Sequence, residues 1–183
     1  MILATPDPRL SGRAVDRIVY DAGQIAERVR GLGAEITAAY PGGDLLVLGL
    51  LKGSVIFMAD LVRRIERPLQ LDFLAAASYG DAMESTGSVR LLYDPNTPLR
   101  GKDILLVEDI LDTGRTLNCL LALLSARNPR SLETCVLLDK GIATALTRRP
   151  RFVGFDAPRE FLVGYGLDHG EDFRHLPYVA TLL

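Results

Sequence analysis

Lysine is scarce in this sequence: of the 21 basic side chains in 183 residues, only 3 are Lys, at Lys52, Lys102 and Lys140. Basic residues do not exceed acidic ones, and the formal net charge of −2 offers no extended surface for a nucleic-acid backbone. No apolar run approaches the roughly 18 residues that cross a bilayer, and the N-terminal segment lacks the basic-then-apolar order of a secretory signal. These absences predict a cytoplasmic protein without nucleic-acid or membrane partners.

Cysteine is also rare, and neither of its two positions suggests a covalent staple or a metal site. Cys119 and Cys135 both lie in apolar stretches without metal-ligand spacing, so two free thiols in a reducing compartment are expected. A chain of 183 residues that is 48% apolar and 24% charged is typical of one globular domain with its own core.

Apolar residues alternate along the chain between helical spacing and short continuous runs. The first helical stripe follows Asp21, a candidate N-cap, and consists of Ile25, Val29, Leu32 and Ile36. We expect helices over residues 21–40, 55–65 and 115–127, and strands over residues 45–51, 69–78, 88–94, 103–109, 132–139 and near Phe152 and Leu162. Strands that alternate with helices predict an α/β fold, in which helices flank both faces of a parallel twisted sheet.

The carboxyl end of one predicted strand carries the densest group of chemically useful residues, and ligands of such folds bind at these strand ends. Glu108 and Asp109 end the strand, and a Thr-Gly-Arg-Thr turn over residues 113–116 opens the next helix. Backbone N–H groups at a helix start can bind phosphate, glycine permits close approach, and the threonine hydroxyls add donors. The alternative is that Asp112 or Thr113 merely caps the helix.

Residues 107–117, VEDILDTGRTL, resemble the phosphoribosyl-diphosphate-binding signature of type I phosphoribosyltransferases. Further segments resemble hypoxanthine-guanine phosphoribosyltransferases in the same order along the chain, at residues 51–54, 78–80, 138–140 and 152–179. The resemblance implies one phosphoribosyltransferase domain, with a core over residues 40–150 and a small hood built from the N-terminal segment and residues 151–183. It also implies a function in purine salvage, where 5-phosphoribose passes from phosphoribosyl diphosphate to hypoxanthine or guanine, giving IMP or GMP and pyrophosphate.

The resemblance assigns roles to residues at several strand ends. Asp112 would be the general base that takes a proton from the purine ring, and Lys140 would donate to the oxygen at the six-position. Phosphoribosyl diphosphate would be held by Lys52, Gly53, Glu108, Asp109, Asp112, Thr113, Gly114, Arg115, Thr116 and Arg174. Because Lys52 and Lys140 would act through an ammonium or the adjoining backbone, we expect that Arg cannot substitute at either position.

The C-terminal part of the resemblance covers the purine site. Phe161 would stack on the base, Leu162 would read its edge through the backbone, and Asp168 would complete the pocket. Taken alone, a Phe in such an apolar segment is more often part of the core. Mg²⁺ would be held by the carboxylates of Glu108, Asp109 and Asp168. His169 departs from the family, which often has Tyr at this position.

Two further features follow from the resemblance. Ser78 and Tyr79 would belong to a loop that closes over the site and excludes water, and the Leu51–Lys52 peptide bond would be cis. Family members are commonly homodimers or homotetramers, so a homo-oligomer is expected. Two alternatives stay open: a xanthine phosphoribosyltransferase, and a regulator with the same fold that senses nucleotides and binds RNA.

Overall fold

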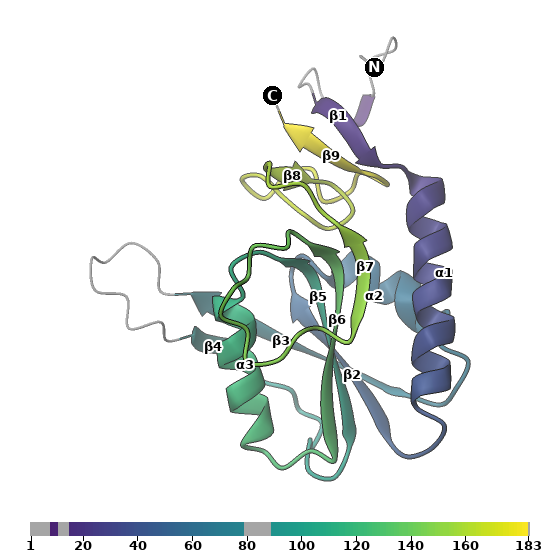
Figure 1. Cartoon of the computed structure of the whole chain (residues 1–183), viewed down its shortest axis with the longest axis vertical. Coiled ribbons are helices and arrows are strands. Elements are labelled where there is room, and N and C mark those ends of the chain that lie inside the picture. The colour runs from purple at the N-terminus through teal and green to yellow at the C-terminus, as the bar shows by residue number, and fades with distance from the viewer. Residues whose placement is uncertain (1–7, 11–14, 79–88, 183) are drawn as a thin grey trace.

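The computed structural model describes residues 8–10, 15–78 and 89–182, which form a large and a small β-sheet (Figure 1). The large sheet has six strands in the order β4-β3-β2-β5-β6-β7. Its strands are β2 (Leu45–Leu51), β3 (Gln70–Ser78), β4 (Val89–Tyr93), β5 (Asp103–Leu111), β6 (Ser131–Asp139) and β7 (Phe152–Asp156). The sequence pattern therefore predicted each of these strands to within a few residues.

The large sheet is parallel except at one edge. Strands β3, β2, β5, β6 and β7 pair parallel to their neighbours, whereas β4 pairs antiparallel with β3. The chain passes from β3 to β4 through residues 79–88, a connection shorter than the dozen or more residues that a parallel crossover needs. The predicted α/β fold is confirmed, with an antiparallel edge strand as the departure.

Three helices cover the two faces of this sheet (Figure 1). The helices α1 (Ala22–Ala39) and α2 (Val55–Val62) lie on one face, and α3 (Arg115–Ser125) lies on the other. Each face of the sheet has its own apolar core, and alternate residues of a strand belong to different cores. In β5, Leu105 and Val107 pack with α1 and α2, while Ile104 and Leu106 pack with α3. Among the described residues, no helix is long and apolar enough to cross a membrane.

The start of α1 is set by a local sequence signal. The Asp21 side chain accepts a hydrogen bond from the Gln24 backbone N–H at 2.9 Å, and the Gln24 side chain accepts one from the Asp21 N–H at 2.9 Å. This reciprocal capping box satisfies two N–H groups that a helix start would otherwise leave unpaired. The predicted stripe is the buried face of the helix, at Ile25, Val29, Leu32 and Ile36.

The small sheet joins the two ends of the chain above the carboxyl ends of the large sheet (Figure 1). It contains β1 (Val15–Tyr20), β8 (Leu162–Val163) and β9 (Val179–Leu182) in the order β1-β9-β8, and we call it the hood. A short 3₁₀ helix, Pro8–Leu10, contributes Leu10 to the small core of the hood. The hood was predicted to include residues 151–183, but β7 belongs to the large sheet because it pairs with β6.

Candidate active site

Adjacent strands bring Asp112 and Lys140 together. Leu111 and Asp139, the last residues of β5 and β6, are paired in register, so the residues that follow them emerge at the same level. The Lys140 Nζ lies 3.0 Å from Asp112 Oδ2, and the Lys140 backbone N–H donates to the Leu111 carbonyl at 3.1 Å. The Lys140 side chain is only 11% exposed, whereas Asp112 is 49% exposed. A carboxylate open to a ligand is thus held beside a sheltered ammonium.

A small pocket follows directly along the chain from Asp112. Its volume is about 80 Å³, and Glu108 and residues 110–117 line it; we call it the phosphate cradle. Gly114 is the N-cap of α3, with a φ of 77°, and no side chain of the described residues caps this helix start. The alternative that Asp112 or Thr113 merely caps α3 is therefore wrong. The unpaired N–H groups of the first turn are available to an anion.

Glu108 is a buried acid in the wall of the phosphate cradle. The residue is 7% exposed, and within the described part of the chain its Oε2 atom has no hydrogen-bond partner. Burial, with a smaller effect from the Asp109 charge, raises the pKa of Glu108 to about 8. At neutral pH this carboxyl group is mostly protonated, so it can both donate and accept hydrogen bonds. A buried unpaired group of this kind suits the hydroxyl of a ligand.

On the opposite face of β5, Asp109 meets the loop that follows β2. Gly53 lies so close that a Cβ atom there would be 1.7 Å from Asp109 Oδ2. Burial raises the pKa of Asp109, the backbone N–H of Ile110 opposes that shift, and the nearby charges of Arg174 and Asp168 act in opposite directions. Arg174 Nη2 pairs with Asp168 Oδ1 at 2.8 Å. The structure thus brings together four residues that the resemblance had assigned to diphosphate and metal.

Glu171 connects the hood to the loop after β2, and it was not among the site residues predicted from the sequence. The Lys52 Nζ donates to Glu171 Oε2 at 3.0 Å, and Arg174 Nη2 lies 3.4 Å from the same oxygen. The hydrogen bond from Lys52 lowers the pKa of Glu171. An acid three residues before the predicted Arg174 was the available signal. The peptide bond between Leu51 and Lys52 is cis, as the resemblance implied.

The predicted purine-stacking residue is on the surface. Phe161 is 56% exposed, and its ring meets the His169 ring edge-on, with centroids 5.4 Å apart and planes at 89°. The alternative that Phe161 belongs to the core is therefore wrong. Leu162 follows in β8 and is buried, so only its backbone could read a ligand. Ser78 ends β3, and Tyr79 lies outside the described residues.

With this geometry in place, comparison with known proteins identifies the family. Residues 17–169 match the family model described as a phosphoribosyl transferase domain. The chain belongs to the phosphoribosyltransferase family. Its type I fold is shared by a crystal structure of a hypoxanthine phosphoribosyltransferase from Staphylococcus aureus, which has a TM-score of 0.88 and 41% sequence identity and matches over 92% of each chain.

Curated relatives in the phosphoribosyltransferase family agree with the structural match. A hypoxanthine-guanine phosphoribosyltransferase from Mycobacterium avium is 45% identical over 92% of this chain and 86% of the relative. The bifunctional protein TilS/HprT of Listeria innocua is 41% identical over 92% of this chain. The chain spans 26% of the length of that Listeria protein, so the similarity concerns about a quarter of it.

In the structure of this phosphoribosyltransferase, two of the three carboxylates predicted to bind metal lie on opposite faces of β5. Among the described residues, no group of three or more His, Cys, Asp or Glu side chains is placed to hold a metal ion. Glu108 and Asp109 are consecutive in a strand and point to opposite faces, so they would reach a ligand or a metal from different sides of β5, and the assignment of Glu108, Asp109 and Asp168 to Mg²⁺ stays a prediction. Asp168 lies near enough to Asp109 for its charge to raise the pKa of Asp109.

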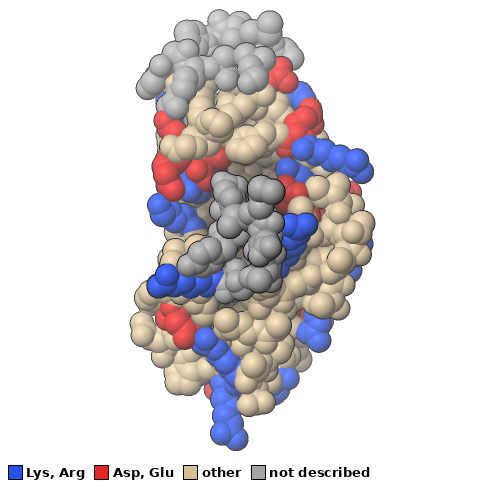
Figure 2. Space-filling model, turned by 90° about the vertical axis from the view of Figure 1, so that its left-hand side faces the viewer, with Lys and Arg blue, Asp and Glu red and all other residues tan. Residues whose placement is uncertain are grey.

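Charged residues of both signs are interspersed on the face of the phosphoribosyltransferase shown in Figure 2. Blue and red side chains lie close to each other where the hood meets the large sheet, on the part of this face that the structure describes. A protein that binds a nucleic-acid backbone instead gathers Lys and Arg into a patch or stripe. This mixed pattern gives no support to an RNA-binding regulator.

Proposed function

We propose that this chain transfers 5-phosphoribose from phosphoribosyl diphosphate to a 6-oxopurine, hypoxanthine or guanine, and releases pyrophosphate. The observation that carries the proposal is the 3.0 Å pair of Asp112 and Lys140 beside an uncapped helix start. A carboxylate, an ammonium and a phosphate cradle are the groups that this reaction needs at one strand edge. The names of the relatives support the same substrate class.

In the proposed reaction, Asp112 takes a proton from a ring nitrogen of the purine. That nitrogen forms a bond to the anomeric carbon while the bond from this carbon to the diphosphate oxygen breaks. The electron pair of the breaking bond leaves with pyrophosphate, and positive charge develops on the sugar. Until the proton is fully transferred, the Asp112 carboxylate, 49% exposed, would also favour that charge electrostatically.

Lys140 would select the purine by its six-position. An ammonium has only donors, so it can bond to the oxygen of a 6-oxopurine but meets further donors in a 6-aminopurine. Its low exposure strengthens this choice, because a sheltered charge interacts more strongly than a solvated one. Phe161 would stack on the same base, since its ring is exposed and held on edge by His169.

The diphosphate end of the substrate would lie among Gly53, Lys52 and Arg174. Asp109 and Asp168 would fit Mg²⁺, because carboxylates are the hard oxygen ligands that this ion prefers, the two residues are close enough to interact electrostatically, and Mg²⁺ commonly binds through one or two carboxylates and substrate phosphates. When bound, Mg²⁺ would neutralise charge on the leaving pyrophosphate. Arg174, paired with Asp168 at 2.8 Å, would orient this carboxylate and offer a further donor to phosphate.

A direct assay tests the proposed function. Purified protein is mixed with phosphoribosyl diphosphate and Mg²⁺, and absorbance changes are followed with hypoxanthine, guanine, xanthine or uracil as the acceptor. We expect product from hypoxanthine or guanine and none from uracil. Product from xanthine alone would replace the assignment with xanthine phosphoribosyltransferase, and no product from any purine would favour the regulator. Sedimentation of the same preparation tests the homodimer or homotetramer that we propose.

A further inference from the structure

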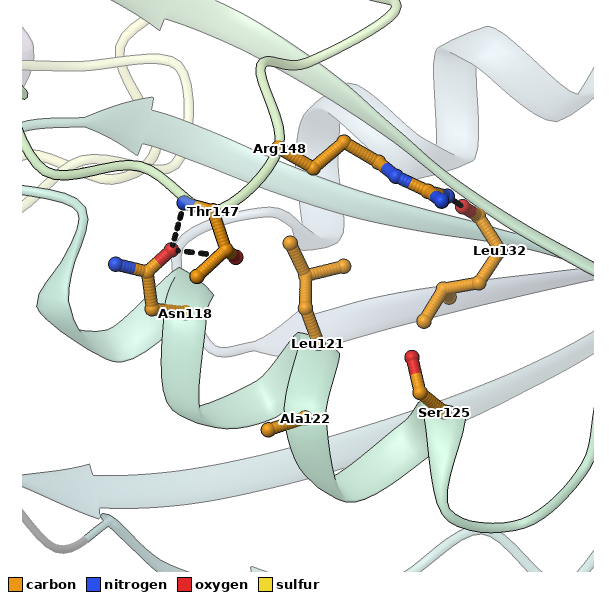
Figure 3. Close-up of a pocket in the computed structure, with 7 residues that line it drawn as sticks. All are labelled: Asn118, Leu121, Ala122, Ser125, Leu132, Thr147 and Arg148. Atoms are coloured by element: carbon orange, nitrogen blue, oxygen red, sulfur yellow. Dashed lines mark hydrogen bonds between the residues drawn. The ribbon is translucent and has the colours of Figure 1, made fainter.

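We infer that Asn118 is a positioning residue for the phosphate cradle, an inference that rests on the proposed function. Asn118 lies in the first turns of α3 and faces residues 140–150, a segment without helix or strand (Figure 3). This segment, which we call the bridging segment, leads from the end of β6 to β7. Its shape must be fixed by contacts with its surroundings, since it has no backbone ladder of its own.

Three hydrogen bonds join the Asn118 side chain to the bridging segment. Asn118 Nδ2 donates to the Ala145 carbonyl at 2.7 Å. Asn118 Oδ1 accepts from the Thr147 backbone N–H at 2.9 Å and from the Thr147 hydroxyl at 3.0 Å, as Figure 3 shows. The Asn118 side-chain amide thus donates to the residue before Leu146 and accepts from the residue after it.

Leu146 forms part of the wall around the N-cap of α3. A Cβ atom at Gly114 would lie 2.4 Å from Leu146 Cδ2 and 3.3 Å from the Ala143 Cβ atom, so these side chains contact the glycine backbone. Gly114 has its φ at 77° and lies where the N–H groups of the phosphate cradle begin. Because Asn118 holds both neighbours of Leu146, it fixes the side chain that backs this turn.

Packing between α3 and the bridging segment is incomplete beside Thr147. A pocket of about 300 Å³ lies between α3 and the bridging segment, where Asn118, Leu121, Ser125 and Thr147 are among the lining residues (Figure 3). The segment is therefore not backed by close-packed side chains at Thr147. Leu146 packs against the apolar cluster that contains Leu117 and Leu120 of α3, so without the amide of Asn118 this packing alone would hold it beside Gly114.

The purine end of the bridging segment has separate anchors. The Lys140 backbone N–H donates to the Leu111 carbonyl at 3.1 Å, and the Gly141 N–H donates to Asp139 Oδ1 at 2.8 Å. Neither bond involves α3. Loss of the Asn118 contacts should consequently disturb the phosphate cradle while Lys140 keeps its place, which separates the effects on the two substrates.

The test is a kinetic comparison of Asn118→Ala with the unmodified protein. We expect the KM for phosphoribosyl diphosphate to rise about five- to tenfold, the change that one or two net hydrogen bonds correspond to. The KM for the purine and the kcat should stay within about twofold, as for a substitution that leaves the chemistry intact. Leu146→Ala should give the same pattern, and it keeps the inference testable if Asn118→Ala fails to fold.

Gln70→Ala is the matched control, because its amide accepts one hydrogen bond, from Lys102 at 2.7 Å, at the amino end of β3. This variant should keep both KM values. An unchanged KM for phosphoribosyl diphosphate in both test variants would overturn the inference, and so would an equal rise in both KM values, which indicates a general loss of structure. If the unmodified protein forms no product, the proposed function fails, and the positioning role fails with it. If the unmodified protein is active but Asn118→Ala and Leu146→Ala keep its KM for phosphoribosyl diphosphate, only the positioning role is refuted.

Discussion

At the scale of single residues, the proposed role of Asp112 as the general base can be tested directly. Replacing Asp112 with Asn keeps the shape of the side chain and the phosphate cradle but removes the proton acceptor. General-base catalysis typically contributes about 10²–10⁴-fold, so we expect kcat to fall by at least about 100-fold. The affinity for phosphoribosyl diphosphate, measured by calorimetry, should be retained. Normal turnover would exclude Asp112 as the base, and Asp94→Asn, at an exposed ion pair with Arg127, is the control.

Asp103, unlike Asp112, has a structural role, because it stabilises the fold at the end of β5 that is remote from the candidate active site. Its side chain is 9% exposed, and its carboxylate accepts hydrogen bonds from Arg130 Nε at 2.8 Å and from the Ser131 hydroxyl at 2.7 Å. The hydrogen bond from Arg130 is the main cause that holds the pKa of Asp103 below its usual 3.8. The charged form is therefore favoured in the folded state, and β5 is tied at its first residue to the start of β6.

This arrangement predicts a pH-dependent loss of stability for Asp103→Asn. A lowered pKa stabilises the fold at pH values above about 4, and that contribution disappears as the pH falls through the folded-state pKa. At pH 7 we expect the free energy of unfolding to fall by about 2 kcal/mol, measured by urea titration, because hydrogen bonds to a charged group are lost. The difference should shrink at pH 3. Asp94→Asn should change stability by less than about 1 kcal/mol at both pH values, and an equal loss there would refute the assignment.

At the scale of elements, the active site depends on how the hood is seated on the large sheet. Tyr165 in the hood donates a hydrogen bond to Asp60 of α2 at 2.7 Å. Gly166 follows it and lies against the Gly53 carbonyl, where an added Cβ would be only 2.1 Å away. Two glycines from segments far apart in sequence thus let the hood touch the loop that would carry pyrophosphate.

Gly166→Ala should unseat this contact. Gly166 has a φ of +103° as well as the close carbonyl, so alanine would meet both backbone strain and a clash. We expect a loss of about 2–3 kcal/mol in unfolding free energy and a higher KM for phosphoribosyl diphosphate. Gly170→Ala in the same region, with a φ of +60° and nothing within 4 Å, carries the backbone cost alone. Equal effects in the two variants would show that the contact with Gly53 contributes nothing.

Sequence reasoning predicted these elements well where the signal is local. The stripe of α1, the apolar run of β2 and the turn over residues 113–116 all lie within short windows that periodicity and turn chemistry describe. Long-range pairing was harder to predict. The assignment of β7 to the large sheet depends on its partner β6, and Glu171 reaches Lys52 across 119 positions of sequence. Asn118, in turn, looks like any polar residue of an amphipathic helix.

At the scale of the whole molecule, the three lysines lie in different environments. Lys102 bonds to Gln70 at the amino edge of the large sheet, far along the strands from the candidate active site. Lys52 and Lys140 are both at carboxyl ends, but the Lys52 side chain is 66% exposed, whereas Lys140 is 11% exposed. The shelter around the ammonium, more than the position at a strand end, should decide whether arginine is tolerated.

We therefore predict different outcomes for the three Lys→Arg substitutions. Lys140→Arg should lower kcat/KM for the purine by at least about tenfold, because a planar guanidinium is larger than an ammonium and would displace Asp112 or the base. For Lys52 the exposure revises the expectation from the sequence that arginine cannot substitute there: Lys52→Arg should stay within about twofold, since an exposed arginine can still pair with Glu171, and Lys102→Arg should match it. The comparison is made with saturating phosphoribosyl diphosphate. Full activity of Lys140→Arg would mean that a positive charge suffices there, and the proposed recognition of the six-position by a compact donor would have to be abandoned.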